Sequence, residues 1–420
     1  MRNLNYLFNS LREKYFTFDS NLKDLVLSGK EDAAVIANSH PELYECLLTE
    51  KFLVSQNKDE VSDCINKINE KFASDKYLRI TINPTLDCNL KCWYCYENHI
   101  KGSCMEENTI EAVMKFIESR AKSTTLEKIQ LSFFGGEPLL KYNQVVKPIV
   151  ERTGEICRKH HKLFMISFTT NGVCLTPKVI EELKALSHEV SIQVAFDGDK
   201  TFHDSVKCFA NGKGCYDIVR GHLVSAIHND IRVTIRCNYT LDNFDSFRNL
   251  IEDFKEYWNC SNVRFSFHKV WQEPESAELF AKRETLKRDI LNLGIKSNID
   301  SYYGDSLTPC YADFNNHIVV NYNGDIYKCT ARDFKPENRL GYLNDDGEII
   351  YNDMAQKRFK AKLTKQCLSC RMLPICMICF QQRSESVDGS CPIPPVYKNA
   401  TINIRKYFYD VIALKHQAAT

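Results

Sequence analysis

Residues 77–95 read YLRITINPTLDCNLKCWYC, and the rest of the chain is best interpreted outward from this stretch. A β-rich run, 77–83, leads into a loop that carries Cys88, Cys92 and Cys95. Three thiolates on one short loop can hold three irons of a single 4Fe–4S cluster and leave the fourth iron without a protein ligand. A purely structural site would supply a fourth cysteine. The loop therefore predicts a reactive metal centre.

Similar β-rich runs recur downstream and are separated by longer helical stretches, which is the pattern of repeated β/α units and a parallel sheet. We predict strands at 77–83, 128–134, 163–169, 190–196, 232–238 and 263–268. Six such units predict an α/β fold, a partial, TIM-like (β/α)6 barrel that need not close. In barrels of this kind the loops after the carboxyl ends of the strands carry the chemistry. The three cysteines lie on the first of these loops.

The composition limits which partners are expected and indicates what the cysteines do. The 420 residues include 55 Lys plus Arg against 54 Asp plus Glu, so net charge gives no reason to expect nucleic acid as a partner. The amino terminus has no apolar signal region and no stretch of about 18 apolar residues follows, which predicts a cytoplasmic chain without a membrane partner. Cytoplasmic thiols stay reduced, and 19 cysteines is an odd number, so metal ligation is expected rather than disulfides.

The 19 cysteines separate into patterned and scattered sets. Ten form two patterned groups. The remaining nine are predicted to be small buried hydrophobic residues; they are Cys46, Cys64, Cys104, Cys157, Cys174, Cys208, Cys215, Cys237 and Cys260.

The first cysteine group has the spacing C-x3-C-x2-C with Tyr94 before the last cysteine, which resembles the signature of the radical S-adenosylmethionine (SAM) superfamily. Gly135, Gly136 and Glu137 of the run GGEP follow the second predicted strand and resemble the family motif that meets the SAM ammonium group. The resemblance implies that the open iron binds SAM and that one-electron cleavage yields a 5′-deoxyadenosyl radical. Three ligands of a zinc site, or a chance pattern, are the alternatives.

Further positions at predicted strand ends match places where this family contacts SAM: Ser167, Asn171, Asp197 and Asn238. A buried strand serine is the alternative for Ser167. His203 and Asp204 continue a pattern common in the same branch, but the arginine often found three residues later is Lys207 here. This departure leaves their role open.

The second cysteine group resembles the SPASM extension of the same superfamily. Its seven members are Cys310, Cys329, Cys367, Cys370, Cys376, Cys379 and Cys391. The resemblance implies one auxiliary 4Fe–4S cluster on the four ligands Cys367, Cys370, Cys376 and Cys391. It implies a second on Cys310, Cys329 and Cys379, although Cys379 follows Cys376 after two residues instead of three. With the cluster of the first group, three 4Fe–4S clusters are expected. A zinc-ribbon-like site on the two C-x2-C pairs is the alternative.

The resemblance and the periodicity together predict three domains. Residues 1–74 show helical spacing with short β-like runs at 15–18 and 52–54, which predicts three small helices in a winged-helix-like module. This module resembles the winged-helix domains that recognise leader peptides in many peptide-modifying members of the family, which implies leader recognition here. A helical cap on the barrel is the alternative. Residues 75–295 are predicted to be the radical SAM barrel, ending in a helix over 275–293. Residues 296–420 are predicted to be the SPASM domain, closed by an amphipathic helix over 399–414.

Many radical SAM proteins with SPASM domains are oxidoreductases that modify peptides or proteins, and this chain resembles that group. We therefore expect an enzyme that forms a thioether, C–C or C–O crosslink in a ribosomally made precursor peptide. Its expected partners are that precursor with its leader and an external one-electron reductant of the flavodoxin or ferredoxin type. An anaerobic sulfatase-type maturase is an alternative, disfavoured because Thr330 stands where those enzymes usually carry an aspartate. A non-enzymatic iron–sulfur or zinc redox protein is the other.

Overall fold

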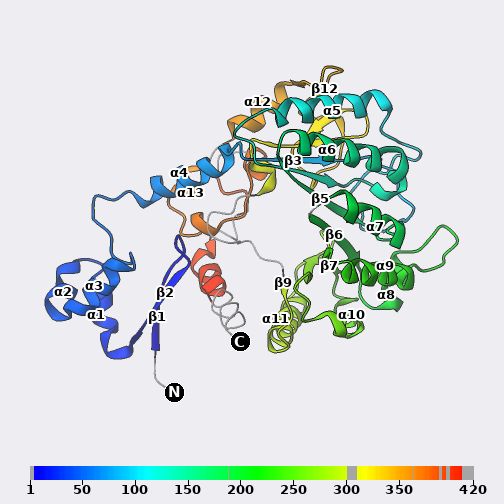
Figure 1. Ribbon diagram of the computed structural model, residues 1–420. Helices are drawn as coiled ribbons and strands as arrows, with labels where there is room; N and C mark the ends of the chain where they lie inside the picture. Colours follow the sequence, from blue (N-terminus) through cyan, green and yellow to red (C-terminus); the bar gives the residue numbers. More distant parts are fainter. Residues whose placement is uncertain are drawn as a thin grey trace. The chain divides into compact units, whose positions relative to one another are not determined.

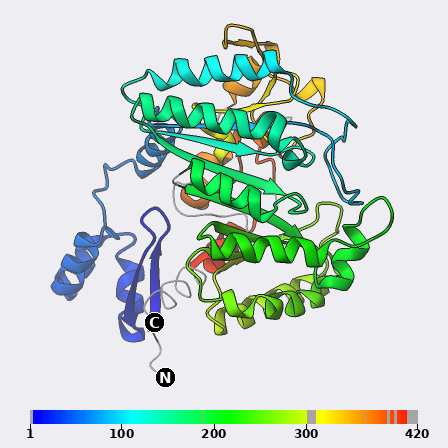
Figure 2. The same ribbon diagram turned by 45° about the vertical axis from the view of Figure 1, so that its right-hand side comes forward.

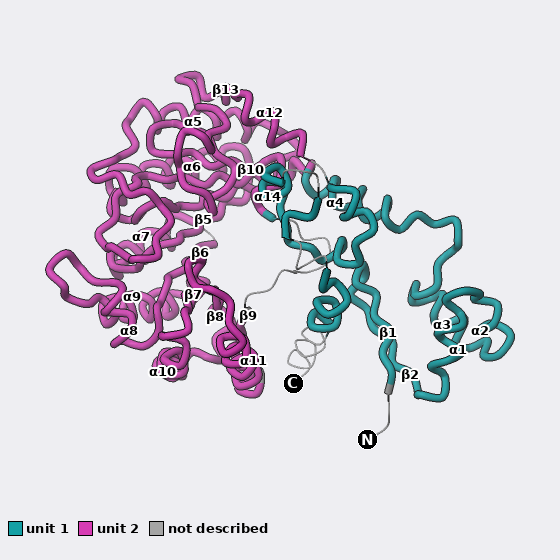
Figure 3. The backbone as a smooth tube through the Cα atoms, turned by 180° about the vertical axis from the view of Figure 1, so that it is seen from behind, with its two compact units in different colours: residues 1–72, 302–310, 362–420 teal, residues 73–301, 311–361 magenta. Residues whose placement is uncertain are grey.

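The computed structural model describes residues 4–187, 189–299, 310–361, 363–386, 390–393 and 398–408. The chain divides into two compact units, shown in Figure 3. Unit 1 comprises residues 1–72, 302–310 and 362–420, and unit 2 comprises residues 73–301 and 311–361. No helix of the described part is long and apolar enough to cross a membrane.

Unit 2 is built on a parallel sheet with a strand at each of the six predicted positions. These are β3 (Tyr77–Ile82), β4 (Lys128–Phe133), β5 (Leu163–Thr170), β6 (Glu189–Phe196), β7 (Arg232–Tyr239) and β8 (Val263–Lys269). Neighbours in this order are hydrogen-bonded in parallel. Figures 1 and 2 show the connecting helices along one side of the curved sheet. They include α5 (Glu107–Ala121), α6 (Lys147–Lys159), α7 (Pro177–Leu186), α8 (Lys200–Val206), α9 (Tyr216–His228) and α10 (Phe247–Asp253). The prediction of an α/β fold on a parallel sheet is confirmed.

The sheet continues beyond the six predicted strands on both sides. The predicted linker helix is α11 (Ala277–Asn292), and β9 (Ser297–Ile299) after it pairs in parallel with β8. On the other side, β10 (His317–Val320) pairs in parallel with β3. An antiparallel extension follows: β11 (Asp325–Tyr327), β12 (Gly341–Leu343) and β13 (Ile349–Tyr351), before α12 (Asp353–Lys360). Residues 311–361 therefore lie in the unit of the barrel strands, and the three-domain division stays a prediction.

The two faces of the barrel strands differ in chemistry. Every second residue is buried, as in β5, where Phe164, Ile166 and Phe168 pack in the core with residues of the helices. Most of the intervening positions of the barrel strands are polar, and Ser167 and Thr169 of β5 line a cavity instead. Side chains alternate between the two faces of a strand, so one face holds the helices and the other remains a polar cavity wall. In a closed TIM barrel the inner positions are filled by bulky apolar side chains.

Unit 1 begins with a hairpin, β1 (Leu4–Asn9) paired with β2 (Lys14–Asp19). The helices α1 (Lys23–Ser28), α2 (Ala33–Ser39), α3 (Pro41–Thr49) and α4 (Glu60–Ala73) follow. Aromatic side chains of the hairpin pack on the helical residues 400–408, with Phe8 5.2 Å from Phe408 between ring centroids. The predicted C-terminal helix is thus helical over 400–408, and residues 409–414 lie outside the described part.

Two details of the amino-terminal prediction are wrong. Residues 52–54 form no strand, because Phe52 and Leu53 pack as side chains against the cluster of Ile36, Leu43 and Leu47. The strand that pairs with β2 is β1. Four α-helices are present where three were predicted. A separate helix, α2, begins after Asp32, which caps it by accepting a hydrogen bond from the Ala34 amide.

Candidate functional site

The first cysteine group lies on the loop that leaves the carboxyl end of β3. Hydrogen bonds within the loop hold it in shape: Thr85 Oγ1 donates to the Ser103 carbonyl at 2.6 Å, and the Leu86 amide donates to Ser103 Oγ at 2.9 Å. Cys88 Sγ accepts from Asn171 Nδ2 at 3.8 Å. The loop after β5, which carries Asn171, is thereby joined to the cysteine loop.

Gly135 and Gly136 form a turn after β4 that touches the cysteine loop. Their φ angles are +82° and +47°, in the region that favours glycine. A Cβ atom on Gly136 would lie 2.2 Å from the Asp87 carbonyl oxygen, and one on Gly135 would lie 2.7 Å from Asn83 Cγ. The Glu137 amide donates to the same Asp87 oxygen at 2.9 Å. The turn therefore holds the backbone beside Cys88, and only glycine fits there.

Two carboxylates lie next to this turn, one fully buried and the other half-buried. Glu137 is fully buried, and it accepts hydrogen bonds from Thr170 Oγ1 and the Asn171 amide, both at 2.7 Å. Glu97 Oε2 accepts from the Gly136 amide at 2.7 Å, and burial raises the pKa of Glu97 to about 7. Glu137 therefore ties the turn to the end of β5, and Glu97 ties it to the cysteine loop.

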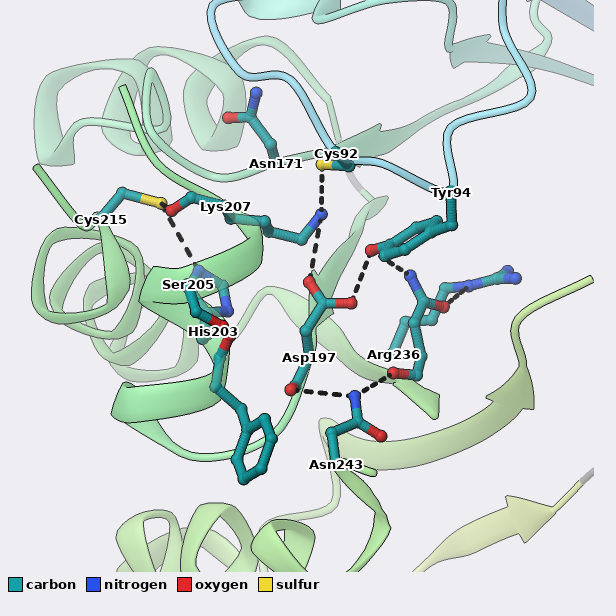
Figure 4. A network of polar contacts seen from close by, with 12 residues as sticks. Cys92, Tyr94, Asn171, Asp197, His203, Ser205, Lys207, Cys215, Arg236 and Asn243 are labelled. Atoms are coloured by element: carbon teal, nitrogen blue, oxygen red, sulfur yellow. Dashed lines mark hydrogen bonds and ion pairs between the residues drawn. The ribbon is translucent and has the colours of Figure 1, made fainter. Parts of the chain in front are cut away.

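Cys92 and Tyr94 belong to a buried polar network, shown in Figure 4. Lys207 Nζ donates to Cys92 Sγ at 3.3 Å and lies 3.5 Å from Asp197 Oδ2. Tyr94 Oη donates to Asp197 Oδ1 at 2.6 Å and accepts from Asn238 Nδ2 at 3.1 Å. Three predicted SAM-site residues thus meet one cysteine of the loop through a lysine.

The network places a buried lysine beside the Cys92 sulfur. Lys207 is 5% exposed and Asp197 is 1% exposed. Burial acts to lower the pKa of Lys207, but Tyr94, Asp197 and Cys92 raise it well above its ordinary value. Burial raises the pKa of Asp197, and Lys207 opposes that shift. We conclude that Lys207 is cationic at neutral pH, because its partners are acidic groups.

The structure assigns His203 and Asp204 a supporting role. Asp204 Oδ1 accepts from the Tyr216 amide at 2.8 Å at the start of α9. Cys215 Sγ lies 3.5 Å from His203 Nε2 and donates to the Lys207 carbonyl at 3.2 Å. Together these contacts hold the backbone that carries Lys207.

Burial lowers the pKa of His203 to about 3, and this has a consequence for stability. An unfolded histidine titrates near 6.5, so the unfolded state binds a proton between about pH 6.5 and 3 and the folded state does not. Stability from this residue is complete above pH 6.5 and is lost as pH falls through that range. At pH 5 the loss is about 2 kcal/mol. We expect His203→Gln to flatten the fall in the free energy of unfolding between pH 7 and pH 5, measured by urea denaturation. An unchanged slope would contradict the assignment.

Ser167 lies on the polar face of β5 rather than in the core. Its hydroxyl donates to Ser132 Oγ at 2.7 Å and accepts from Gln130 Nε2 at 2.9 Å. All three residues line a cavity of about 600 Å³ on the inner face of the barrel strands, together with Tyr311 and Thr330. The hydroxyls of Tyr311 and Thr330 are hydrogen-bonded at 2.6 Å.

In unit 1, four cysteines of the second group line one pocket. They are Cys367, Cys370, Cys376 and Cys391. Arg383 lines the same pocket, and its guanidinium donates to Cys367 Sγ at 2.6 Å and lies 3.8 Å from Cys376 Sγ. These four thiols are the set that the SPASM resemblance assigns to one cluster.

The remaining three cysteines of the second group are divided between the units. Cys310 and Cys379 belong to unit 1 and Cys329 belongs to unit 2, so their joint assignment stays a prediction. Cys329 Sγ accepts from the Ala331 amide at 3.2 Å. Among the described residues, no three His, Cys, Asp or Glu side chains form a group that could hold a single metal ion.

Sequence reasoning missed three residues of these sites: Lys207, Glu97 and Arg383. Lys207 could have been predicted, because it stands where the family often carries arginine and lysine keeps the positive charge at that position. Glu97 and Arg383 had none. Their side chains reach Gly136 and Cys367 across the fold, and no spacing in the sequence shows those contacts.

Residues 82–211 match the sequence model of the Radical SAM superfamily. This chain carries a radical SAM domain. The matched residues include the cysteine loop, the Gly135–Gly136 turn, Asp197 and Lys207, so most of the network described above lies within this radical SAM domain.

Proteins similar to this chain include a maturating enzyme and a synthase. Radical SAM cyclopropyl synthase TigE of Paramaledivibacter caminithermalis is 27% identical over 288 residues, which cover 62% of this chain and 54% of TigE. The serine-type anaerobic sulfatase-maturating enzyme of Bacteroides thetaiotaomicron is 23% identical over 372 residues, 76% of this chain and 83% of that protein.

Two solved structures share the fold. The anSMEcpe structure with bound AdoMet has a TM-score of 0.58 at 18% identity and covers 82% of this chain and 98% of that chain. Streptococcus suis SuiB bound to precursor peptide SuiA has a TM-score of 0.50 at 15% identity and covers 91% of this chain and 96% of that chain. At these identities the likeness is one of fold alone.

The donor set on the cysteine loop fits the 4Fe–4S cluster and SAM that the family implies. Cys88, Cys92 and Cys95 are soft ligands within one short segment of the loop. The other cysteine of the loop, Cys104, packs against the core and contacts Gln144 Oε1 instead. Lys207 supplies a buried positive charge at Cys92, which suits an anionic cluster–thiolate group. The Gly135–Gly136 turn leaves no side chain between the backbone and the loop.

Proposed function

We propose that this radical SAM enzyme is a peptide maturase that forms an intramolecular thioether, C–C or C–O crosslink in a ribosomally made precursor peptide. The observation that carries the proposal is the buried Cys92–Lys207–Asp197–Tyr94 network on the cysteine loop of a barrel whose inner face is polar. SuiB binds a precursor peptide, and TigE is a cyclopropyl synthase, which supports a peptide substrate and a bond-forming reaction.

Each part of the site has a role in this proposal. Cys88, Cys92 and Cys95 hold the cluster, and bound SAM supplies a 5′-deoxyadenosyl radical that abstracts hydrogen. Gly135, Gly136 and Glu137 shape the backbone that receives the SAM ammonium group. The Glu137 carboxylate positions this backbone by joining it to the end of β5, because it accepts hydrogen bonds from Thr170 and Asn171. The other proposed contacts to SAM are Tyr94, Ser167, Asn171, Asp197 and Asn238.

Two auxiliary clusters complete the proposal. The first is held by Cys367, Cys370, Cys376 and Cys391, whose side chains line one pocket. The second is held by Cys310, Cys329 and Cys379. Crosslinking after hydrogen abstraction is a net oxidation, and an auxiliary cluster can accept the electron. An external flavodoxin- or ferredoxin-type protein supplies the electron that starts the reaction.

The amino-terminal module is proposed to bind the leader of the precursor. Among the described residues β1 and β2 pair only with each other, and an extended peptide can add to the edge of such a hairpin through main-chain hydrogen bonds. In this proposal residues 1–74 are a winged-helix-like recognition domain, residues 75–295 a partial (β/α)6 barrel, and residues 296–420 the SPASM domain.

The test is anaerobic reconstitution with iron and sulfide, followed by iron counting and an assay of 5′-deoxyadenosine with SAM and dithionite. We expect about twelve irons per chain, the content of three 4Fe–4S clusters. Cys92→Ala is expected to abolish SAM cleavage and to retain about eight of those irons. Incubation with the precursor peptide, once identified, should yield a product that lacks two hydrogens.

Cys104→Ala is the matched control, since Cys104 belongs to neither patterned group. It is expected to retain all the iron and SAM cleavage. Normal 5′-deoxyadenosine formation by Cys92→Ala would overturn the proposal, as would zinc without cleavage in the wild type. Conversion of a sulfatase serine or cysteine to formylglycine would instead support the sulfatase-type alternative. That alternative lacks its usual aspartate here, because Thr330 stands at the position and pairs with Tyr311.

Arg383 offers a test of the first auxiliary cluster. Arg383 is 8% exposed, and its guanidinium contacts the sulfurs of two proposed ligands. Its positive charge therefore stabilises the reduced, more negative state of the cluster. We expect Arg383→Met to lower the potential of one auxiliary cluster by tens of millivolts in an EPR-monitored redox titration. Arg371→Met, at an exposed neighbour of Cys370, is the control and should leave that potential unchanged. Equal potentials in the wild type and Arg383→Met would contradict the assignment.

A further inference from the structure

The cavity on the inner face of the barrel strands has a charge pattern that the SAM site does not explain. Besides Ser132 and Ser167, its lining includes Arg79 from β3 and Arg264 from β8. No acidic residue is among the described residues that line it. The cavity, about 600 Å³ in volume, therefore presents two positive charges and polar neutral groups.

Neither arginine is neutralised by a carboxylate of the described part of the chain. Arg79 Nη2 donates weakly to Tyr77 Oη at 3.4 Å, and its guanidinium lies 5.3 Å from the Tyr77 ring centroid. The buried Arg79 Nε has no hydrogen-bond partner among the residues that the structure describes. Arg264 is exposed and forms no ion pair with a described residue. Structural arginines elsewhere in the fold do have acidic partners, as Arg358 does in Asp313 at 2.6 Å.

Arginine pairs in a polar cavity suit a planar anion. A guanidinium presents its donors in a fork that matches the two oxygens of a carboxylate, and such charge-assisted bonds are about twice as strong as neutral ones. An unpaired buried donor such as Arg79 Nε costs free energy until a partner arrives. A neutral substrate segment would leave both charges uncompensated inside the barrel.

We propose that the barrel cavity of this enzyme is a carboxylate subsite, in which Arg79 and Arg264 select peptide substrates that place an Asp or Glu side chain, or a free C-terminal carboxylate, inside the barrel. The inference rests on the proposed peptide substrate and deepens it. It names a substrate class, peptides with an acidic group at the segment that enters the barrel.

The test compares three small probes on the reconstituted full-length enzyme by saturation-transfer NMR. The probes are Ac-Gly-Glu-Gly-NH2, its isostere Ac-Gly-Gln-Gly-NH2, and Ac-Gly-Gln-Gly with a free C-terminal carboxylate. We expect at least one carboxylate probe to bind about tenfold more tightly than the neutral amide, the factor that corresponds to about 1.4 kcal/mol. The probe that shows this preference tells a side-chain from a C-terminal carboxylate.

The variants connect the preference to the arginines. In Arg79→Gln/Arg264→Gln the tenfold preference should vanish. Arg264→Gln alone should reduce the preference severalfold. Because Arg264 is exposed, this single variant should fold normally and serves as a check if the double variant misfolds. Arg120→Gln removes an exposed arginine on α5, outside the cavity, and should leave the preference intact.

Four results would overturn the inference. One is that neither carboxylate probe binds more tightly than the neutral Gln amide probe, and another is a preference that survives in the double variant. The third is tighter binding of inorganic phosphate than of either carboxylate probe. Loss of SAM affinity in the double variant with no change in probe binding would likewise assign the arginines to SAM. 5′-Deoxyadenosine formation in the same preparation tests the proposed function separately, so SAM cleavage without probe preference refutes only the subsite.

Discussion

Lys207→Met is expected to lower the reduction potential of the cluster proposed on Cys88, Cys92 and Cys95 by on the order of 100 mV. The Lys207 ammonium lies 3.3 Å from Cys92 Sγ in a buried network. A unit charge about 5 Å from the cluster contributes about 3 kcal/mol at an effective dielectric constant of about 20, and it favours the reduced, more negative state. An EPR-monitored redox titration measures the shift, and SAM cleavage with a biological reductant should fall at least about tenfold.

The Lys207 prediction has controls that separate charge from folding. Lys207→Arg keeps a cation at the position and should retain most of the potential. Lys207→Met alone leaves the buried Asp197 carboxylate without its cation, which costs about 3–5 kcal/mol of stability. Lys207→Met/Asp197→Asn removes both charges and should recover stability, whereas the potential should recover only in part, because loss of the Asp197 charge offsets part of the loss of the Lys207 charge. A wild-type potential in that double variant would show that Lys207 only supports the fold.

Gly136→Ala is expected to remove the SAM-site cluster, with iron falling by about four atoms per chain. The added methyl group would lie 2.2 Å from the Asp87 carbonyl oxygen, on backbone that cannot move without displacing the loop of Cys88. The φ angle of +47° adds strain for any residue with a Cβ atom. Iron analysis and the 5′-deoxyadenosine assay measure the loss.

Gly221→Ala is the matched control. Gly221 lies on α9, and a Cβ atom there would meet no atom within 4 Å. This variant should keep all the iron and should be slightly more stable, since alanine favours a helix over glycine. Full iron content and normal SAM cleavage in Gly136→Ala would show that the turn does not constrain the cysteine loop.

The site was predictable wherever its residues are local in sequence. Cys88, Cys92 and Cys95 share one loop, Gly135 and Gly136 share one turn, and a strand end is recognisable because apolar alternation stops there. The same local patterns predicted both ends of each barrel strand to within one residue. It failed over 52–54, where Phe52 and Leu53 read as a strand but pack into a helical cluster. A short apolar run has the same appearance in both settings.

The sequence by itself therefore determined the chemistry: the thiolate triplet, the glycine turn and the order of strands that carries them to one end of the sheet. These features follow from side-chain type and periodicity, which are properties of short segments. Only the tertiary structure decided which charges accompany that chemistry. Lys207 reaches Cys92 across 115 positions of sequence, and Arg79 and Arg264 face one cavity from β3 and β8. Such contacts depend on how distant strands and loops pack, and a linear pattern does not encode those distances.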